Sequence, residues 1–256
     1  MKKTALLLVA ACCFAAGLGG CKSGGGVKQD PLLKLSAEES LTEGKQLLAN
    51  KKYDRARPYF THAFEVEPNS RIGRESLLLA ADSYFMSGGS ANYIQAEAKY
   101  RDYLNRFPTS EQAPYVQFQI ANSLAKRMER PDRDQTVTRK ALQAYQELTR
   151  LYPTSEYAAH GQEQVEAVKG KLAEHEFMIG NFYLRYGVPI AAAERFEFLL
   201  ENYPAYAGKD KVIYNLGLAY QRSRKMDEAR KAFDRLRTEF PNSPLVHEIP
   251  DLKVGA

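Results

Sequence analysis

Residues 172–204 form the most regular stretch of the chain and limit what it can fold into. The stretch reads LAEHEFMIGNFYLRYGVPIAAAERFEFLLENYP, and apolar residues return at helical spacing in both of its halves. Gly187 and Pro189 separate the two halves. Proline is favoured at the start of a helix because its φ angle already suits one. The stretch therefore predicts two helices joined by a tight turn.

Small and aromatic residues within this stretch stand at a recurring spacing. Gly180, Tyr183, Ala192, Phe196 and Pro204 follow one another at intervals of 3, 9, 4 and 8 residues. This spacing is typical of the tetratricopeptide repeat, a helix–turn–helix unit of about 34 residues. Four other units share its small residues, aromatic residue and closing proline: Gly44, Ala56, Phe60 and Pro68; Ala81, Ala96, Tyr100 and Pro108; Ala121, Ala141, Tyr145 and Pro153; and Gly217, Ala229, Phe233 and Pro241.

A single helix pair of this kind cannot bury its own apolar face, so neighbouring pairs must stack. The sequence therefore predicts an all-α fold, a right-handed superhelical solenoid of five tetratricopeptide repeats. Repeats 1–3 are expected in residues 37–154, and a long linking helix with repeats 4–5 in residues 155–243. The long helix should run from about Ser155 to Tyr186, and a kink at Gly170 stays open. Residues 244–256 are expected to form a flexible tail.

The first 21 residues predict export and lipid attachment. Lys2 and Lys3 precede an almost wholly apolar run, as in a secretory signal peptide, and the run is too short to span a membrane. It ends in LGGC at positions 18–21, which resembles a bacterial lipobox. This resemblance implies that residues 1–20 are removed and that Cys21 is lipidated. Residues 21–36, which are glycine-rich near their start, are then expected to be a flexible tether.

Two alternatives compete with lipidation at Cys21. The sequence VAAC at positions 9–12 also fits a lipobox, but cleavage there would leave too short an apolar segment. A chance cysteine after an ordinary signal peptide is disfavoured by the small residues before it. Once residues 1–20 are removed, Cys21 is the only cysteine left, so no disulfide can form within the mature chain. Lys22 replaces the aspartate that retains lipoproteins in the inner membrane, and by resemblance to that sorting rule the outer membrane is favoured.

Charge and histidine placement argue against nucleic-acid binding and catalysis. The formal net charge is +5 at pH 7. It falls to about +3 without Lys2 and Lys3, which is too small and too dispersed to attract nucleic acid. The histidines show no metal-ligand spacing, and neither a phosphate-binding glycine loop nor a Gly-x-Ser-x-Gly motif occurs. We expect no enzyme activity, no cofactor and no metal.

Three polar residues have both a chemical and a structural interpretation. His175, between Glu174 and Glu176, could act chemically, but a hydrogen bond to a neighbouring turn is the simpler expectation. Asp132 and Asp134 could bind a cation, but two carboxylates in a turn more often cap a helix and pair with arginines.

Longer segments are more specific than the repeat pattern. They are DRDQT (132–136), YPTSEYAA (152–159), LAEHEFMIGNFYLRYG (172–187) and AAAERFEFLLENYP (191–204). Together with the lipobox they resemble the BamD family of outer-membrane assembly lipoproteins, over residues 41–244. The resemblance implies a non-enzymatic scaffold on the periplasmic face of the outer membrane. Such a scaffold works with the BamA barrel protein and other assembly-complex lipoproteins in folding and inserting β-barrel proteins.

The resemblance also implies a division of labour along the array. The amino-terminal repeats would receive an extended carboxy-terminal segment of an unfolded outer-membrane protein, and the carboxy-terminal repeats would dock the periplasmic domains of BamA. Arg195 matches the family arginine at the docking side, although Glu194 beside it could pair with it. For client binding we expect a groove in the first two units that includes Tyr84, Phe85 and Tyr100. The repeat pattern also gives Tyr84 and Tyr100 packing positions.

Two other functions compete with barrel assembly. A lipoprotein scaffold of the same fold could serve pilus assembly or cell-envelope constriction. An enzyme, or the regulatory subunit of one in peptidoglycan turnover, would need a nucleophile–base pair or a metal set, and the sequence offers neither.

Overall fold

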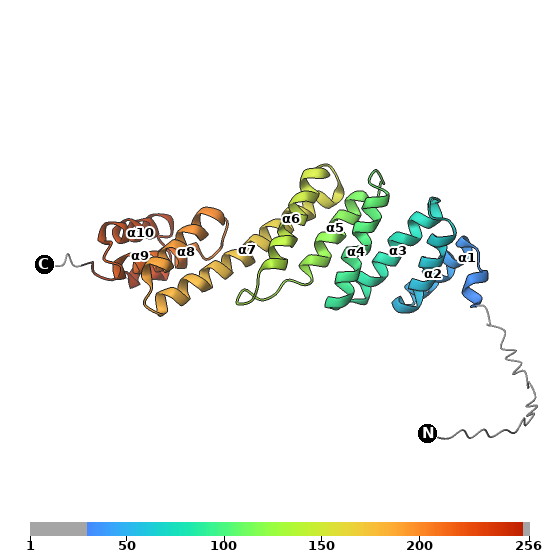
Figure 1. The fold of residues 1–256 in the computed structure, drawn as a ribbon. Helices are drawn as coiled ribbons and strands as arrows, with labels where there is room; N and C mark the ends of the chain where they lie inside the picture. The colour runs from blue at the N-terminus through green and yellow to red at the C-terminus, as the bar shows by residue number, and fades with distance from the viewer. Residues whose placement is uncertain (1–29, 253–256) are drawn as a thin grey trace, which may run out of the picture.

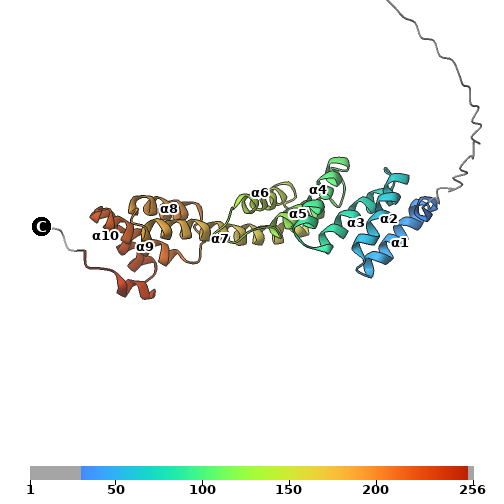
Figure 2. The same cartoon turned by 60° about the horizontal axis from the view of Figure 1, so that its bottom comes forward.

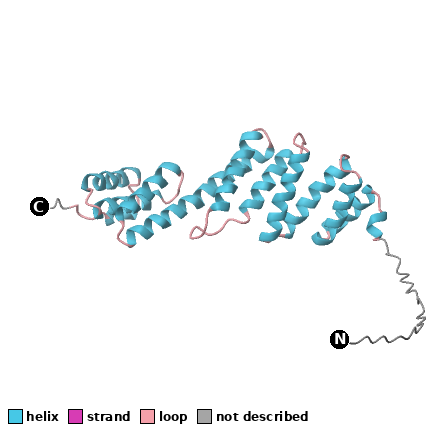
Figure 3. Cartoon of the chain, in the orientation of Figure 1, coloured by secondary structure: helices cyan, strands magenta, loops and turns pink. Residues whose placement is uncertain are grey.

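The computed structural model describes residues 30–252, and this part of the chain is all-helical (Figure 1). No strand occurs among the described residues (Figure 3). The fold class predicted from the sequence is therefore confirmed as all-α, while the number of repeats and the hand of the superhelix stay predictions. Residues 1–29 and 253–256 lie outside the described part, and with them the signal peptide, Cys21 and most of the tether.

The ten α-helices of the described residues run in chain order along an elongated array (Figure 1). Short 3-10 helices, Pro31–Lys34 and Pro244–Glu248, flank them. The α-helices are α1 (Ala37–Ala49), α2 (Tyr53–Val66), α3 (Arg71–Ser87), α4 (Ser90–Arg106), α5 (Ala113–Ala125), α6 (Thr136–Leu151), α7 (Glu156–Arg185), α8 (Pro189–Asn202), α9 (Lys209–Arg222) and α10 (Met226–Glu239).

Each helix packs against the next helix in the chain, which is how stacked helix pairs build an array. Further contacts join α1 to α3, α5 to α7, and α7 to α9. Odd-numbered helices therefore share one side of the array. Because each contact is local in sequence, the array grows in one direction, and the first and last helices lie at opposite ends (Figure 2).

Close packing of an aromatic ring on a glycine holds three of the helix pairs together. A Cβ atom added at Gly44, Gly180 or Gly217 would come within 3.0 Å of the ring of Phe60, Phe196 or Phe233, respectively. The three rings are almost completely buried. In the pairs α3–α4 and α5–α6, the corresponding residues are Ala81 with Tyr100 and Ala121 with Tyr145, which are also buried. The small and aromatic positions of the repeat pattern are thus the interior of the fold.

The turns of three helix pairs, α1–α2, α7–α8 and α9–α10, each hold one residue in the left-handed region of the backbone map. Lys51, Gly187 and Arg224 have φ angles of 59°, 75° and 62° and stand at equivalent places after α1, α7 and α9. Glycine reaches this conformation at little cost, whereas lysine and arginine adopt it with strain. The sequence signal at Gly187 therefore reflects a real constraint of the turn.

Helix α7 is the longest of the described helices and belongs to two hydrophobic cores (Figure 1). Its first half contributes Val165 and Val168 to the core of α3–α6, and its second half contributes Ala173 and Leu184 to the core of α8–α10. A third core joins α1 and α2 to Ala80 of α3. The long helix expected near Ser155–Tyr186 is present and runs without interruption through Gly170.

The packing of Phe196 on Gly180 makes a direct prediction for stability. Gly180→Ala should lower the free energy of unfolding by about 1–3 kcal/mol, because the buried ring has no room to move away from the new methyl group. Gly170→Ala on the same helix is the control. It meets no atom within 4 Å and should raise stability by about 1 kcal/mol through helix propensity. Urea unfolding followed by circular dichroism measures both changes, and equal effects of the two variants would contradict the packing argument.

Candidate functional site

The segment at 172–176, LAEHE, ties α7 to two loops of the chain. His175 Nδ1 lies 2.5 Å from the carbonyl oxygen of Pro131, in the loop before α6. The hydroxyl of Tyr206, in the loop between α8 and α9, donates to Glu174. Leu172, in the same segment, is buried. The histidine therefore makes the contact to a neighbouring turn that was expected of it.

The segment DRDQT (132–136) builds the loop that His175 contacts. Asp134 caps α6 by accepting hydrogen bonds from the backbone nitrogen and the hydroxyl of Thr136, at 3.0 and 2.9 Å. These bonds hold the pKa of the Asp134 carboxyl below its usual range. Asp132 pairs with Arg130 at 3.1 Å. The buried Gln135 donates to the carbonyl oxygens of Arg130 and Arg133.

Two of the segments that carry the family resemblance are therefore joined through Pro131, which directly precedes DRDQT, although 44 residues separate Pro131 from His175. Their polar side chains fix the loop before α6 against the middle of α7. This contact lies where the hydrophobic core of α3–α6 gives way to that of α8–α10, so it sets how the two parts of the array meet.

Arg195 lies on α8 and forms an ion pair with α7. Its Nη1 donates to Glu176 Oε2 at 3.1 Å, and 44% of the arginine side chain is exposed against 14% of the glutamate side chain. The residue paired with it is thus Glu176, and not the adjacent Glu194. Because almost half of the guanidinium side chain is accessible, Arg195 can still contact a partner.

The three residues expected in a client groove lie in different surroundings. Tyr100 has no exposed surface and its hydroxyl donates to Asp82 at 2.6 Å, so its expected place in an open groove does not fit its burial. Tyr84 is half-buried with the guanidinium of Arg57 3.8 Å from its ring centroid. Phe85 is half-buried against Tyr93. The repeat pattern that gave Tyr100 a packing position was the better guide.

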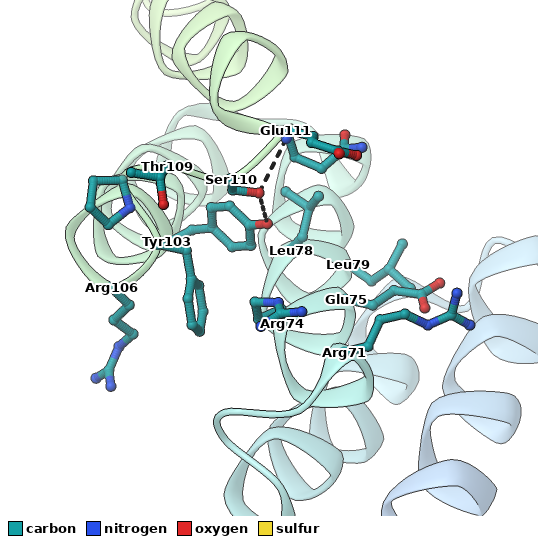
Figure 4. Close-up of a pocket in the computed structure, with 13 residues that line it drawn as sticks. Arg71, Arg74, Glu75, Leu78, Leu79, Tyr103, Arg106, Thr109, Ser110 and Glu111 are labelled. Carbon is teal, nitrogen blue, oxygen red and sulfur yellow. Dashed lines mark hydrogen bonds between the residues drawn. The ribbon is translucent and has the colours of Figure 1, made fainter.

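A groove lies in the second helix pair, at the amino-terminal end of α3 and so away from Tyr84 and Phe85. It has a volume of about 820 Å³ and lies between α3, the end of α4 and the segment that leads to α5. Arg71 and Arg74 of α3 line it together with Tyr103 and Arg106 of α4 (Figure 4). Leu78, Leu79 and Phe107 supply apolar surface. We call this the α3–α4 groove.

Several features of the α3–α4 groove define its chemistry. The guanidinium of Arg74 lies 5.9 Å from the ring centroid of Phe107, and that of Arg106 lies 5.3 Å from the ring centroid of Phe64. A second hollow, lined by α1 and α3, shares Arg71 and Glu75 with the groove and continues it. The groove therefore combines apolar side chains with three arginines and two glutamates, Glu75 and Glu111, and the arginines outnumber the glutamates. The sequence signal for it was Arg71 and Arg74, three residues apart on one helix face, and it was missed because neither is a template position.

Exposed apolar side chains gather at the end of α7 and the start of α8. Phe182 and Tyr186 are 54% and 66% exposed, and their ring centroids lie 4.4 Å apart. Met178, Val188 and Ile190, within a few residues of them, are also exposed. We call these five residues the α7–α8 apolar segment. Large apolar side chains concentrated in one exposed region often mark a contact with another protein.

Neither a metal site nor a membrane-spanning helix is found among the described residues. Residues 30–252 bring no three His, Cys, Asp or Glu side chains together in a way that could hold a metal ion. In the same part of the chain, no helix combines the length and the apolar character needed to cross a membrane.

The stacked helix pairs define a tetratricopeptide-type scaffold, a class of protein that offers extended surfaces to other polypeptides. The sequence pattern of a tetratricopeptide repeat matches residues 211–243. The pattern of the YfiO family, described as "Outer membrane lipoprotein", matches residues 34–222. The chain belongs to this family.

Characterised relatives agree with that assignment. A Rickettsia prowazekii protein named "Outer membrane protein assembly factor BamD" is 30% identical over 227 residues, which is 88% of this chain and 88% of the relative. A Caulobacter vibrioides protein of the same name is 26% identical, and the matched region spans 91% of this chain and 75% of the relative. Among solved structures, the TPR2AB domain of yeast Sti1 covers 81% of this chain and 78% of its own, with a TM-score of 0.43 and 14% identity.

Asp82 makes the junction of α3, α4 and α5 sensitive to pH. Its carboxylate accepts hydrogen bonds from Tyr100 at 2.6 Å and from Tyr115 at 2.9 Å, so it joins α3 to α4 and α5. Burial raises the pKa of Asp82 above that of a free carboxyl, and the two hydrogen bonds oppose this in part. The folded chain therefore holds a proton on Asp82 at a pH where the unfolded chain has lost it.

We expect the contribution of this site to the free energy of unfolding to be largest below about pH 4, the ordinary carboxyl pKa. It should fall as pH rises through the raised pKa of Asp82 in the folded state. Asp82→Asn should flatten this part of the pH profile. Tyr115→Phe removes a hydrogen bond that favours the charged form, so it should extend the profile to higher pH. Urea unfolding between about pH 4 and about pH 7 measures both, and an unchanged slope in Asp82→Asn would contradict the assignment.

Proposed function

We propose that this chain is a lipid-anchored scaffold of outer-membrane β-barrel assembly, held on the periplasmic face of the outer membrane through Cys21. The main support for this proposal is that the chain belongs to the outer membrane lipoprotein family over residues 34–222 and has relatives named as outer-membrane protein assembly factors. The scaffold binds polypeptides and performs no catalysis. Its partners are unfolded outer-membrane proteins, a BamA-like barrel protein and other lipoproteins of the complex. The matching relatives favour this role over pilus assembly or envelope constriction.

The client-binding half of the proposal rests on the α3–α4 groove. An unfolded barrel protein is an extended chain with alternating apolar side chains, and it ends in a negatively charged carboxylate. The groove offers apolar surface from Leu78 and Phe107 beside the guanidinium groups of Arg71 and Arg74. Arginine is well suited to bind a carboxylate because its planar group can donate two parallel hydrogen bonds. We therefore move the proposed client site from Tyr100 to this groove, with Tyr84 and Phe85 at the other end of α3.

The docking half of the proposal rests on the second half of α7 and on α8. The α7–α8 apolar segment supplies exposed rings and aliphatic groups, and Arg195 on α8 supplies an accessible charge. Large apolar side chains with an arginine nearby are the residue types that dominate protein–protein interfaces. A periplasmic domain of the BamA-like protein is the proposed occupant of this region.

Depletion of the protein tests the proposed role directly. Outer-membrane porins should decrease severalfold while other lipoproteins stay in place, measured by quantitative mass spectrometry of outer membranes. Complementation with Cys21→Ala should yield protein that is not attached to the membrane, since one cysteine carries the anchor. Unchanged porin amounts would contradict the assembly role, and normal membrane attachment of Cys21→Ala would contradict lipidation.

Arg195→Gln tests the docking side. Removing the charge should reduce co-purification with the BamA-like protein by about tenfold, since an arginine of this kind often contributes more than 1 kcal/mol to an interface. Glu176→Gln is the matched control, because it breaks the same ion pair and leaves Arg195 charged. It should retain co-purification. Equal losses from the two variants would show that only the link between α7 and α8 mattered.

A further inference from the structure

Gly170, in the middle of α7, has no structural reason within the chain to be a glycine. The other glycines inside the described helices, Gly44, Gly73, Gly161, Gly180 and Gly217, all lie so close to a neighbour that an added Cβ atom would come within 3.0 Å of it. At Gly170 the same atom would meet nothing within 4 Å. A glycine inside a helix costs about 1 kcal/mol relative to alanine. The helix thus gives up stability here without any gain inside the folded chain.

A hollow lies over Gly170. It has a volume of about 270 Å³ and is walled by Tyr203 and Tyr206, which leave the end of α8, and by the small residues at 205 and 207. Glu166 and Lys169 of α7 stand at its side. A side chain at 170 would project toward this space, so the glycine keeps it open. We call the hollow the Gly170 pocket.

Three polar side chains that line the Gly170 pocket, Glu166, Lys169 and Tyr206, already have partners. The hydroxyl of Tyr206 donates to Glu174, and Lys169 pairs with Glu166 at 2.9 Å. The surface left for a bound side chain, which we call the guest, consists of ring faces and methyl groups. Its volume is below the range of roughly 300–1,000 Å³ that holds a whole small-molecule ligand. One large side chain of another polypeptide fits this size and this apolar character.

The charges around the pocket further define the guest. Glu166 lines it, and Glu174 and Asp210 both lie near enough to Tyr206 to raise the pKa of its hydroxyl, to which burial contributes most. Lys169 lines the pocket and pairs with Glu166, so these two charges cancel. Glu176 and Arg139 lie near Tyr203 and, after burial, act on the pKa of its hydroxyl with opposite signs. This leaves Glu174 and Asp210 as the uncompensated charges. A guest segment with lysine or arginine beside its apolar residue would complement this acidic surrounding.

We propose that the Gly170 pocket receives one aromatic or leucine-sized side chain from a partner polypeptide whose neighbouring residues are basic. The site is separate from the α3–α4 groove and from the α7–α8 apolar segment. It lies beside the junction where α7 passes from one hydrophobic core to the next. A partner bound there would contact α7 and the loop after α8 at once, and would stabilise their relative position.

Gly170→Leu separates binding at the pocket from folding. The new side chain should occupy the hollow and pack on Tyr203 and Tyr206, so the midpoint of urea unfolding should rise. The same change should exclude the guest. Stability and binding are therefore expected to move in opposite directions, which simple damage to the fold would not produce. Lys171→Leu, on an exposed position next to it, is the matched control and should leave binding unchanged.

The binding measurement uses the full-length lipoprotein in cells, with a photo-crosslinking benzoylphenylalanine in place of the exposed Ala167, beside Glu166. Mass spectrometry of the crosslinked peptide should show Phe, Tyr, Trp or Leu next to Lys or Arg. Gly170→Leu should reduce the crosslink by at least about tenfold, the factor expected when burial of a large apolar side chain is lost.

Three results would overturn the proposal: no polypeptide crosslink, a crosslink to an acidic segment, or a crosslink that survives Gly170→Leu. The outcome does not depend on the role in barrel assembly. Unchanged porins after depletion would refute the assembly role and leave a Gly170-dependent crosslink standing, whereas loss of porins without such a crosslink would refute the pocket alone.

Discussion

The packing of one aromatic ring against one small residue underlies the whole array. In three helix pairs, the ring of the second helix lies where the first helix has no side chain, as Phe60 does on Gly44 and Phe196 on Gly180, and in the other two pairs a buried alanine and a buried tyrosine hold these positions. This contact sets how closely the two helices approach. The next pair then stacks on the surface so formed, because one pair alone cannot bury its apolar face. A change at any of these glycines would disturb its own pair first and its neighbours through it.

Helix α7 extends this local rule over a longer distance. It contributes to two hydrophobic cores, and polar residues near its middle hold the neighbouring loops and α8 in place. His175 contacts the loop before α6, Glu174 the loop after α8, and Glu176 the second helix of its own pair. The junction therefore combines a continuous helix with three polar contacts. Such a junction suits the proposed scaffold, with its proposed client groove in one half and its proposed docking surface in the other.

Much of the fold could be predicted because its signals are local. Helix periodicity, the spacing of Gly180 and Phe196, and the turn at Gly187 all lie within one unit, and the long α7 followed from an uninterrupted helical stretch. The site was harder to predict. Tyr100 belongs to the core, and the α3–α4 groove uses Arg71, Arg74 and Phe107, which are not template positions. The stacking of successive helix pairs decides which residues of the repeat pattern stay accessible. The sequence of one pair does not contain that information.

The sequence by itself determined the all-helical class, the interior small and aromatic positions, and the likeness to a lipoprotein family. Each of these depends on residue type at a fixed spacing, which a folded neighbour hardly alters. Only the tertiary structure decided which distant groups meet. It placed Pro131 against His175 and Glu176 against Arg195, and it left open space at Gly170 while closing it at Gly180. The physical reason is that a contact or a hollow forms between two surfaces that come from distant parts of the chain. The local sequence pattern describes only one of these surfaces.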